Sequence, residues 1–174
     1  MKRGFNNTEL ARATRANPLG IVGLGLVLIV IIVAVLAPTV ATHDPKKLNR
    51  DDTLLEPSSG HFFGTDVAGR DVFSRVVFGS RTSLRVAATV MAIALTIGGV
   101  MGTIAGYAGG FVSEILMRVT DIFLAFPSLI LALAINAALG PGLNSAIIAV
   151  GITLWPAYAR LIRAQVLANK NNLY

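Results

Sequence analysis

Residues 64–71 have the glycine spacing of a phosphate-binding loop, because GTDVAGRD can be aligned with the pattern G-x-x-x-x-G-K-[ST]. The side chains do not fit that chemistry. Arg70 replaces the lysine that would reach the phosphates, and Asp71 replaces the hydroxyl that would bind magnesium. Asp66 would face the phosphate oxygens. The sequence therefore predicts no nucleotide site here.

The same segment offers carboxylates and a histidine that could act as metal ligands or as an acid–base pair. The candidates are His61, Asp66 and Asp71, but nothing in their spacing forces them to converge. The alternation of Asp66, Arg70, Asp71 and Arg75 favours a self-neutralising network that fixes a loop and forms a contact surface. The absence of cysteine excludes disulfides and thiolate metal sites. We expect no catalytic residue, no metal site and no cofactor.

The elements that hold this polar segment are apolar and long. Hydrophobic residues make up 54% of the chain and charged residues only 14%. The stretches 19–42, 86–113 and 122–159 carry no charge, and about 20 apolar residues suffice for one helix to cross a bilayer. The net charge of +6 comes from basic residues that flank these stretches, which does not indicate a nucleic-acid-binding face. The sequence predicts an all-α integral membrane protein.

We expect about four membrane spans, and the first is 19–37. Its β-branched residues would suit a strand in water, but a lone strand in lipid leaves its backbone unpaired, so a helix is predicted. A cleaved signal peptide is the alternative, although the run is long for one. The second span is 86–107, where Gly98, Gly102 and Gly106 share one face and predict close helix packing. Gly109 and Gly110 should end it.

The third span, 114–139, begins with charges and contains a proline. Glu114 and Arg118 are a favourable i, i+4 pair, and Asp121 lies within reach of Arg118. These charges either neutralise one another at the membrane interface or serve gating. Pro127 should kink the helix. Our candidates for pathway or gating residues are Asp121, Phe126, Pro127 and Asn136.

The fourth span is 144–159, after a turn at Gly140-Pro141-Gly142. Trp155 and Tyr158 suit a membrane interface, and Arg160 and Arg163 follow directly. Four spans place both termini on one side. Basic residues are divided almost evenly between the two sides, so the charge distribution leaves the orientation open.

Three blocks of sequence resemble a known family. Residues 61–87, which begin HFFGTDVAGRD, are similar to the C-type permease subunits of dipeptide, oligopeptide and nickel ABC importers. Residues 102–133 and 155–174 resemble later blocks of the same proteins, in the same order, and residues 17–38 match their first helix in style. The resemblance covers nearly the whole chain.

The resemblance implies a partial type I importer fold in the cell inner membrane of a bacterium or archaeon, with both termini cytoplasmic. It implies a cytoplasmic segment 1–18, a first helix 19–37, an extracytoplasmic segment 38–81 and the front of the transmembrane domain in 82–174. The implied partners are a second permease, two ATP-binding cassette subunits that hydrolyse ATP, and an extracytoplasmic substrate-binding protein. Transport of peptides or similar small solutes would proceed by alternating access.

The family continues beyond the position of Tyr174 with a coupling loop and further helices. We therefore expect a truncated copy whose C-terminal helices are missing. The alternative function is a non-transporting membrane interaction or assembly protein. A membrane-bound enzyme would need convergent catalytic side chains, which the polar segment does not offer. The sequence does not identify the substrate.

Overall fold

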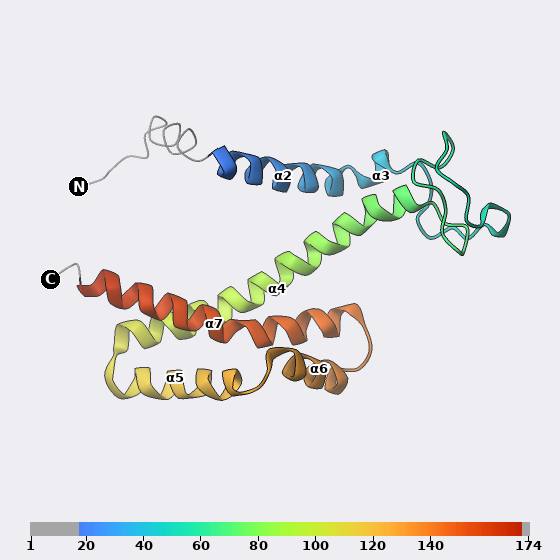
Figure 1. Cartoon of the computed structure of the whole chain (residues 1–174). Helices are drawn as coiled ribbons and strands as arrows, with labels where there is room; N and C mark the ends of the chain where they lie inside the picture. The colour runs from blue at the N-terminus through green and yellow to red at the C-terminus, as the bar shows by residue number, and fades with distance from the viewer. Residues whose placement is uncertain (1–17, 172–174) are drawn as a thin grey trace. The chain divides into compact units, whose positions relative to one another are not determined.

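The computed structural model describes residues 18–171, and every regular element in that range is a helix (Figure 1). An isolated β-bridge between Thr65 and Asp71 is the one extended pairing in these residues. The chain divides into two compact units between Leu84 and Arg85.

The first unit begins with helix α2, Pro18–Val35, and a short helix α3, Ala37–Val40. Proline is favoured at the first position of a helix, since its missing N–H has no partner there anyway. The large apolar side chains of α2 are mostly exposed, with Leu19 85% exposed, while Ala34 is buried. Such a helix needs lipid or another helix around it. It ends before the predicted Ala37 because Pro38 has no N–H to donate to the Ala34 carbonyl.

The polar segment follows as an irregular loop with one 3₁₀ turn, η1, Arg50–Asp52. Thr65 fixes its fold, since its hydroxyl accepts the Leu55 N–H at 2.8 Å and its own N–H donates to the Leu55 carbonyl at 3.1 Å. Gly64 and Gly69 have φ near +70°, and a Cβ atom at Gly69 would overlap the carbonyl oxygen of Asn49. The two glycines of the phosphate-loop pattern therefore make turns.

Helix α4, Val72–Ala108, runs through the boundary between the units. It begins well before the predicted residue 86. Asp71 caps it, because its Oδ2 accepts the Ser74 N–H at 2.8 Å. The helix ends where Gly109 adopts φ 65°, at the predicted Gly109-Gly110 position.

The second unit continues with α5, Gly110–Ala125, α6, Ser128–Leu139, and α7, Leu143–Asn171. The predicted kink at Pro127 is a complete break, with 88° between α5 and α6. Proline disfavours helical backbone at the residue before it, and Phe126 is extended with ψ 138°. The turn at Gly140-Pro141-Gly142 then reverses the chain, and α7 packs alongside both α5 and α6 (Figure 1).

Two described helices are long and apolar enough to cross a membrane, α4 and most of α7. The α5–α6 pair makes a third if the bent pair counts as one span, and α2 is a shorter apolar helix. The 12 residues of α6 reach only about 18 Å, less than the hydrocarbon core of about 30 Å. The all-helical fold with apolar helices is as predicted, but the third of the four predicted spans is broken and the first is a shorter helix.

Candidate functional site

Glycines on α4 lie directly against the backbone of α7. A Cβ atom added to Gly98 would come within 2.7 Å of the Trp155 carbonyl oxygen, and one added to Gly102 within 2.5 Å of the Ala159 oxygen. One added to Gly106 would meet the Cβ of Val166 at 2.7 Å. All three glycines thus permit two helices to approach more closely than side chains would allow.

The contact continues toward the other end of α7. Gly151 of α7 faces Ile93 of α4, where an added Cβ would meet the Ile93 Cβ at 2.9 Å. Trp155 is buried and stacks edge-to-face on Phe123 of α5 at 5.2 Å between ring centroids. Small residues and one large aromatic side chain therefore hold α4, α5 and α7 together in the second unit.

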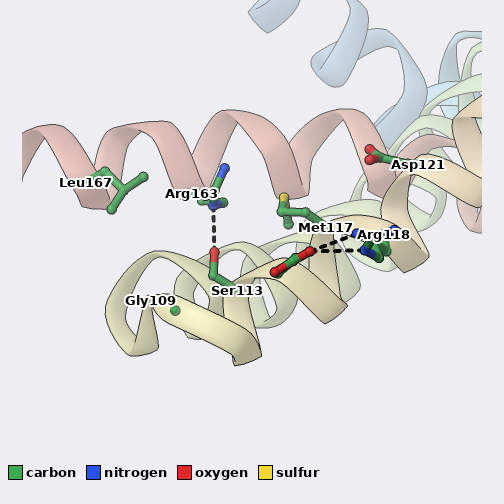
Figure 2. Close-up of a pocket in the computed structure, with 9 residues that line it drawn as sticks. Gly109, Ser113, Met117, Arg118, Asp121, Arg163 and Leu167 are labelled. Carbon is green, nitrogen blue, oxygen red and sulfur yellow. Dashed lines mark hydrogen bonds and ion pairs between the residues drawn. The ribbon is translucent and has the colours of Figure 1, made fainter.

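A pocket of about 580 Å³ lies where α4 turns into α5, beside α7 (Figure 2). Arg163 reaches from α7 and donates from Nε to the Ser113 hydroxyl at 2.9 Å, and Ser113 is buried. The other residues that line the pocket come from the turn and from α5 and α7, and they are Gly109, Gly110, Glu114, Met117, Arg118, Asp121 and Leu167.

The charged residues of α5 use two different kinds of partner. Arg118 donates to Glu114 at 2.8 Å within the helix, which is the i, i+4 pair expected from the sequence (Figure 2). Asp121 does not pair with Arg118. It accepts a hydrogen bond from Arg160 of α7, and both side chains are more than half exposed. Asp121 therefore links α5 to α7.

The other three pathway candidates lie at the break and on α6. Phe126 is 54% exposed and forms the break together with Pro127. Asn136 lies on α6, and its Oδ1 is the one buried side-chain polar atom of residues 18–171 that lacks a hydrogen-bond partner. A buried amide oxygen without a partner is costly, so its presence calls for an explanation.

Asp66 is the centre of the polar loop in the first unit. Its carboxylate accepts the backbone N–H groups of Ala68 and Arg70 at 2.8 and 3.0 Å, the Arg70 Nε at 2.9 Å, and a bond from Arg75. The backbone hydrogen bond from Arg70, with the other donors around the carboxylate, lowers the pKa of Asp66 to about 2. Three members of the predicted network, Asp66, Arg70 and Arg75, therefore come together.

Asp71, the fourth predicted member, has other partners. His61 Nδ1 lies 2.9 Å from its Oδ1, and Ser74 donates to its Oδ2. Burial alone would raise the pKa of Asp71, but hydrogen bonds from Ser74 and His61 lower it. Of the possible metal ligands considered from the sequence, His61 and Asp71 lie together, whereas Asp66 has other partners. His43, whose ring stacks on that of His61, was not among those candidates. Residue type alone could have suggested a pairing of His43 with His61, because they are the two histidines of the sequence. Their wide separation along the chain did not indicate that they meet.

Two family models match the chain. Residues 98–174 match the binding-protein-dependent transport system inner membrane component, and residues 9–57 match the N-terminal transmembrane domain of oligopeptide transport permease C. The first match covers the glycine contact and the pocket, while the second covers α2 and part of the polar loop.

Individual relatives agree with these matches. The chain is 40% identical to the probable D,D-dipeptide transport system permease protein of Escherichia coli K12, over 98% of the chain and 57% of the relative. It is 41% identical to a dipeptide transport system permease protein of Alkalihalophilus pseudofirmus, over 92% of the chain and 53% of the relative. It is 39% identical to the oligopeptide transport system permease protein of Bacillus subtilis 168, over 92% of the chain and 52% of the relative.

The chain spans about half the length of these relatives. The matched blocks include the helices whose packing is described above, in the same order along the sequence. The protein therefore belongs to the family of binding-protein-dependent transport permeases, and within it to the dipeptide and oligopeptide permease C subunits.

Proposed function

We propose that the chain is part of the permease subunit of an ABC importer and helps to move peptides or similar small solutes across the cell membrane. The observation that carries this proposal is the match to peptide permeases over 92–98% of the chain in three relatives. In this proposal the chain performs no catalysis, and separate ATPase subunits hydrolyse ATP.

The packing of the second unit supports a pathway that opens and closes by movement of rigid helices. The contacts of Gly98 and Gly102 with the α7 backbone bring the two helices directly against each other. The break at Phe126 and Pro127 turns α6 away from α5, which leaves backbone at the break that needs protein or water around it. We assign Asp121, Phe126, Pro127 and Asn136 to the pathway or its gate on this basis.

The proposal places both termini in the cytoplasm and residues 38–81 outside. Orientation is testable because the chain has no cysteine. A Ser59→Cys variant carries its thiol in the exposed polar loop, and an Asn169→Cys variant carries it near the end of α7. A membrane-impermeant maleimide should label only the Ser59→Cys variant in intact cells, and both in opened membranes. Labelling of only the Asn169→Cys variant would reverse the orientation.

Transport is tested by restoring uptake in cells. A strain that lacks its own peptide permease of this type receives a full-length relative in which this chain replaces the aligned residues, together with the second permease, the ATPases and the binding protein of that relative. Uptake of a labelled tripeptide should return, and it should be lost when the ATPases cannot bind ATP. Uptake that is absent although the chain is present in the membrane would contradict the proposal.

A non-transporting interaction or assembly protein is the alternative function. Co-purification separates the two. Recovery of the second permease and ATPases together with tripeptide uptake supports the importer. Recovery of the same partners without uptake supports an assembly role.

A further inference from the structure

Both histidines of the chain lie side by side in the polar loop of the first unit. His43 and His61 are the only histidines in the sequence, and their ring centroids are 4.7 Å apart with 30° between the planes. They approach from different stretches, His43 just after α3 and His61 from the middle of the loop. Imidazole is a common metal ligand in its neutral form.

A buried carboxylate stands beside the two rings. The Oδ1 atom of Asp71 is 2.9 Å from His61 Nδ1 and 4.0 Å from His43 Nδ1. The side chain of Asp71 is only 1% exposed, whereas those of His61 and His43 are 16% and 45% exposed. One donor atom from each of the three residues lies within 4.8 Å of the other two.

We propose that His43, His61 and Asp71 bind one divalent transition metal ion of the Zn²⁺ type. Two imidazole nitrogens and one carboxylate oxygen are a donor set that suits zinc, with bonds of about 2.0–2.2 Å. Three protein ligands leave a fourth position for water. A cavity of about 230 Å³ adjoins all three residues and gives the ion a way in.

The surroundings hold two of the ligands in orientation. Ser74 donates its N–H to Oδ2 of Asp71, which leaves Oδ1 for the ion. The Nε2 atom of His61 is 4.0 Å from Oδ2 of Asp52, which is too far for a hydrogen bond, but a shift of about 1 Å would let this carboxylate accept the ring N–H when Nδ1 binds metal. A carboxylate behind a ligating histidine is a regular feature of metal sites and raises the basicity of the ring.

The simpler alternative is a hydrogen bond between His61 and Asp71 that serves the cap of α4. This alternative explains the positions of His61 and Asp71 but not that of His43. The ring of His43 stacks on that of His61, and its Nδ1 bonds to the Thr42 hydroxyl at 3.0 Å. Metal binding uses all three. The ion would tie the end of α3, the loop and the start of α4 to one point, so its role would be structural.

The test is direct binding of Zn²⁺ to the whole purified chain in detergent, with an affinity tag that contains no histidine and a buffer without phosphate. Calorimetry measures the stoichiometry, and Co²⁺ substituted for Zn²⁺ reports the geometry through its visible absorption. The variants are His43→Ala, His61→Ala and Asp52→Asn. Asp51→Asn is the matched control, because it removes the neighbouring carboxylate of η1, which does not line the cavity.

We expect one Zn²⁺ per chain, at least a tenfold loss of affinity in each histidine variant, and a loss of about 10- to 100-fold in Asp52→Asn. Asp51→Asn should bind like the unchanged chain. His43→Ala separates loss of a metal ligand from loss of the fold, because it leaves the His61–Asp71 hydrogen bond intact. Binding that persists in His43→Ala and His61→Ala, or no stoichiometric binding in the unchanged chain, would overturn the proposal.

Discussion

The carbonyl oxygen of Ala159 lies 2.5 Å from the position that a Cβ atom on Gly102 would occupy. The atom in the way belongs to the backbone of α7, so no side-chain rotation can make room. Real Cβ atoms do not approach oxygen this closely, and the two helices would have to separate to admit one. The glycine is thus required by the distance between α4 and α7.

A Gly102→Ala substitution should therefore destabilise the second unit by about 1–3 kcal/mol, the usual cost of adding a methyl group to a tightly packed contact. The measurement is the unfolding midpoint in a denaturing-detergent titration of the purified chain.

Gly99→Ala is the matched control on the same helix. The nearest atom to its added Cβ is the end of the Ile162 side chain at 3.9 Å, an ordinary contact. Alanine is also the better helix former, by about 0.5–1 kcal/mol. Gly99→Ala should leave the midpoint unchanged or raise it. Equal losses in both variants would mean that the α4–α7 contact is not the cause.

Ser113→Ala tests the polar link between α5 and α7. Its hydroxyl is buried and accepts from the charged Arg163, and a hydrogen bond to a charged group contributes about 1.5–3 kcal/mol. Glu114→Gln is the comparison, because the Glu114–Arg118 pair is exposed and worth only about 0.2–0.5 kcal/mol. The unfolding midpoint in denaturing detergent should be clearly lower for Ser113→Ala than for Glu114→Gln. The reverse order would refute the link between α5 and α7.

The low pKa of Asp66 predicts how the polar loop responds to acid. A carboxylate whose pKa is about 2 in the folded chain and 3.8 unfolded stabilises the fold above pH 4, and this contribution fades as the pH falls toward 2. The unfolding midpoint of Asp66→Asn should lie below that of the unchanged chain by a constant amount above pH 4. The gap should then close between pH 4 and 2.

Asp51→Asn supplies the charge-matched control for this pH series, because Asp51 is an exposed residue of η1. It should show no comparable gap at any pH. A gap for Asp66→Asn that persists unchanged at pH 2 would contradict the low pKa.

Gly69→Ala tests the turn in the loop. Its φ of +70° disfavours any side chain, and its Cβ would overlap the carbonyl oxygen of Asn49. Gly60→Ala meets nothing closer than Ser58 Oγ at 3.9 Å, and Gly60 has an ordinary φ. Limited proteolysis should cut the polar loop faster in Gly69→Ala and at the normal rate in Gly60→Ala. Equal rates would show that the turn does not need glycine.

The sequence was sufficient to predict that α4 and α7 are long apolar helices, because charge-free runs are local signals. The predicted ends at Gly109-Gly110 and at the Gly140-Pro141-Gly142 turn are confirmed. The early start of α4 also had a local signal that was overlooked. Aspartate is a preferred residue at the start of a helix, and Asp71 accepts the N–H of Ser74 three residues later.

Pro127 and Pro156 show that residue type alone does not predict whether a helix breaks. Pro127 breaks the chain between α5 and α6, whereas Pro156 lies buried inside α7, which continues through it. Both residues carry the same intrinsic cost, so the difference depends on packing: α7 is held on both sides of Pro156 by α4. The meeting of His43 with His61 is likewise decided by the fold of the loop, which the sequence pattern alone did not reveal.

Asn136 provides the sharpest test of the proposed pathway residues, because stability and transport should respond in opposite directions. Its buried Oδ1 has no hydrogen-bond partner among the described residues, and such an atom costs about 1–3 kcal/mol. Asn136→Leu removes that cost with a side chain of similar size. The variant chain should unfold at the same or a higher detergent concentration than the unchanged chain.

Transport should nevertheless fall in Asn136→Leu, because in the proposed pathway the free amide oxygen would bind solute or water. Tripeptide uptake in the reconstituted importer is the measurement, and we expect at least a tenfold decrease. Asn136→Gln keeps the amide and should retain most of the uptake. If Asn136→Leu transports normally while its stability rises, Asn136 does not belong to the pathway, and the exposed break at Phe126 and Pro127 becomes the better candidate.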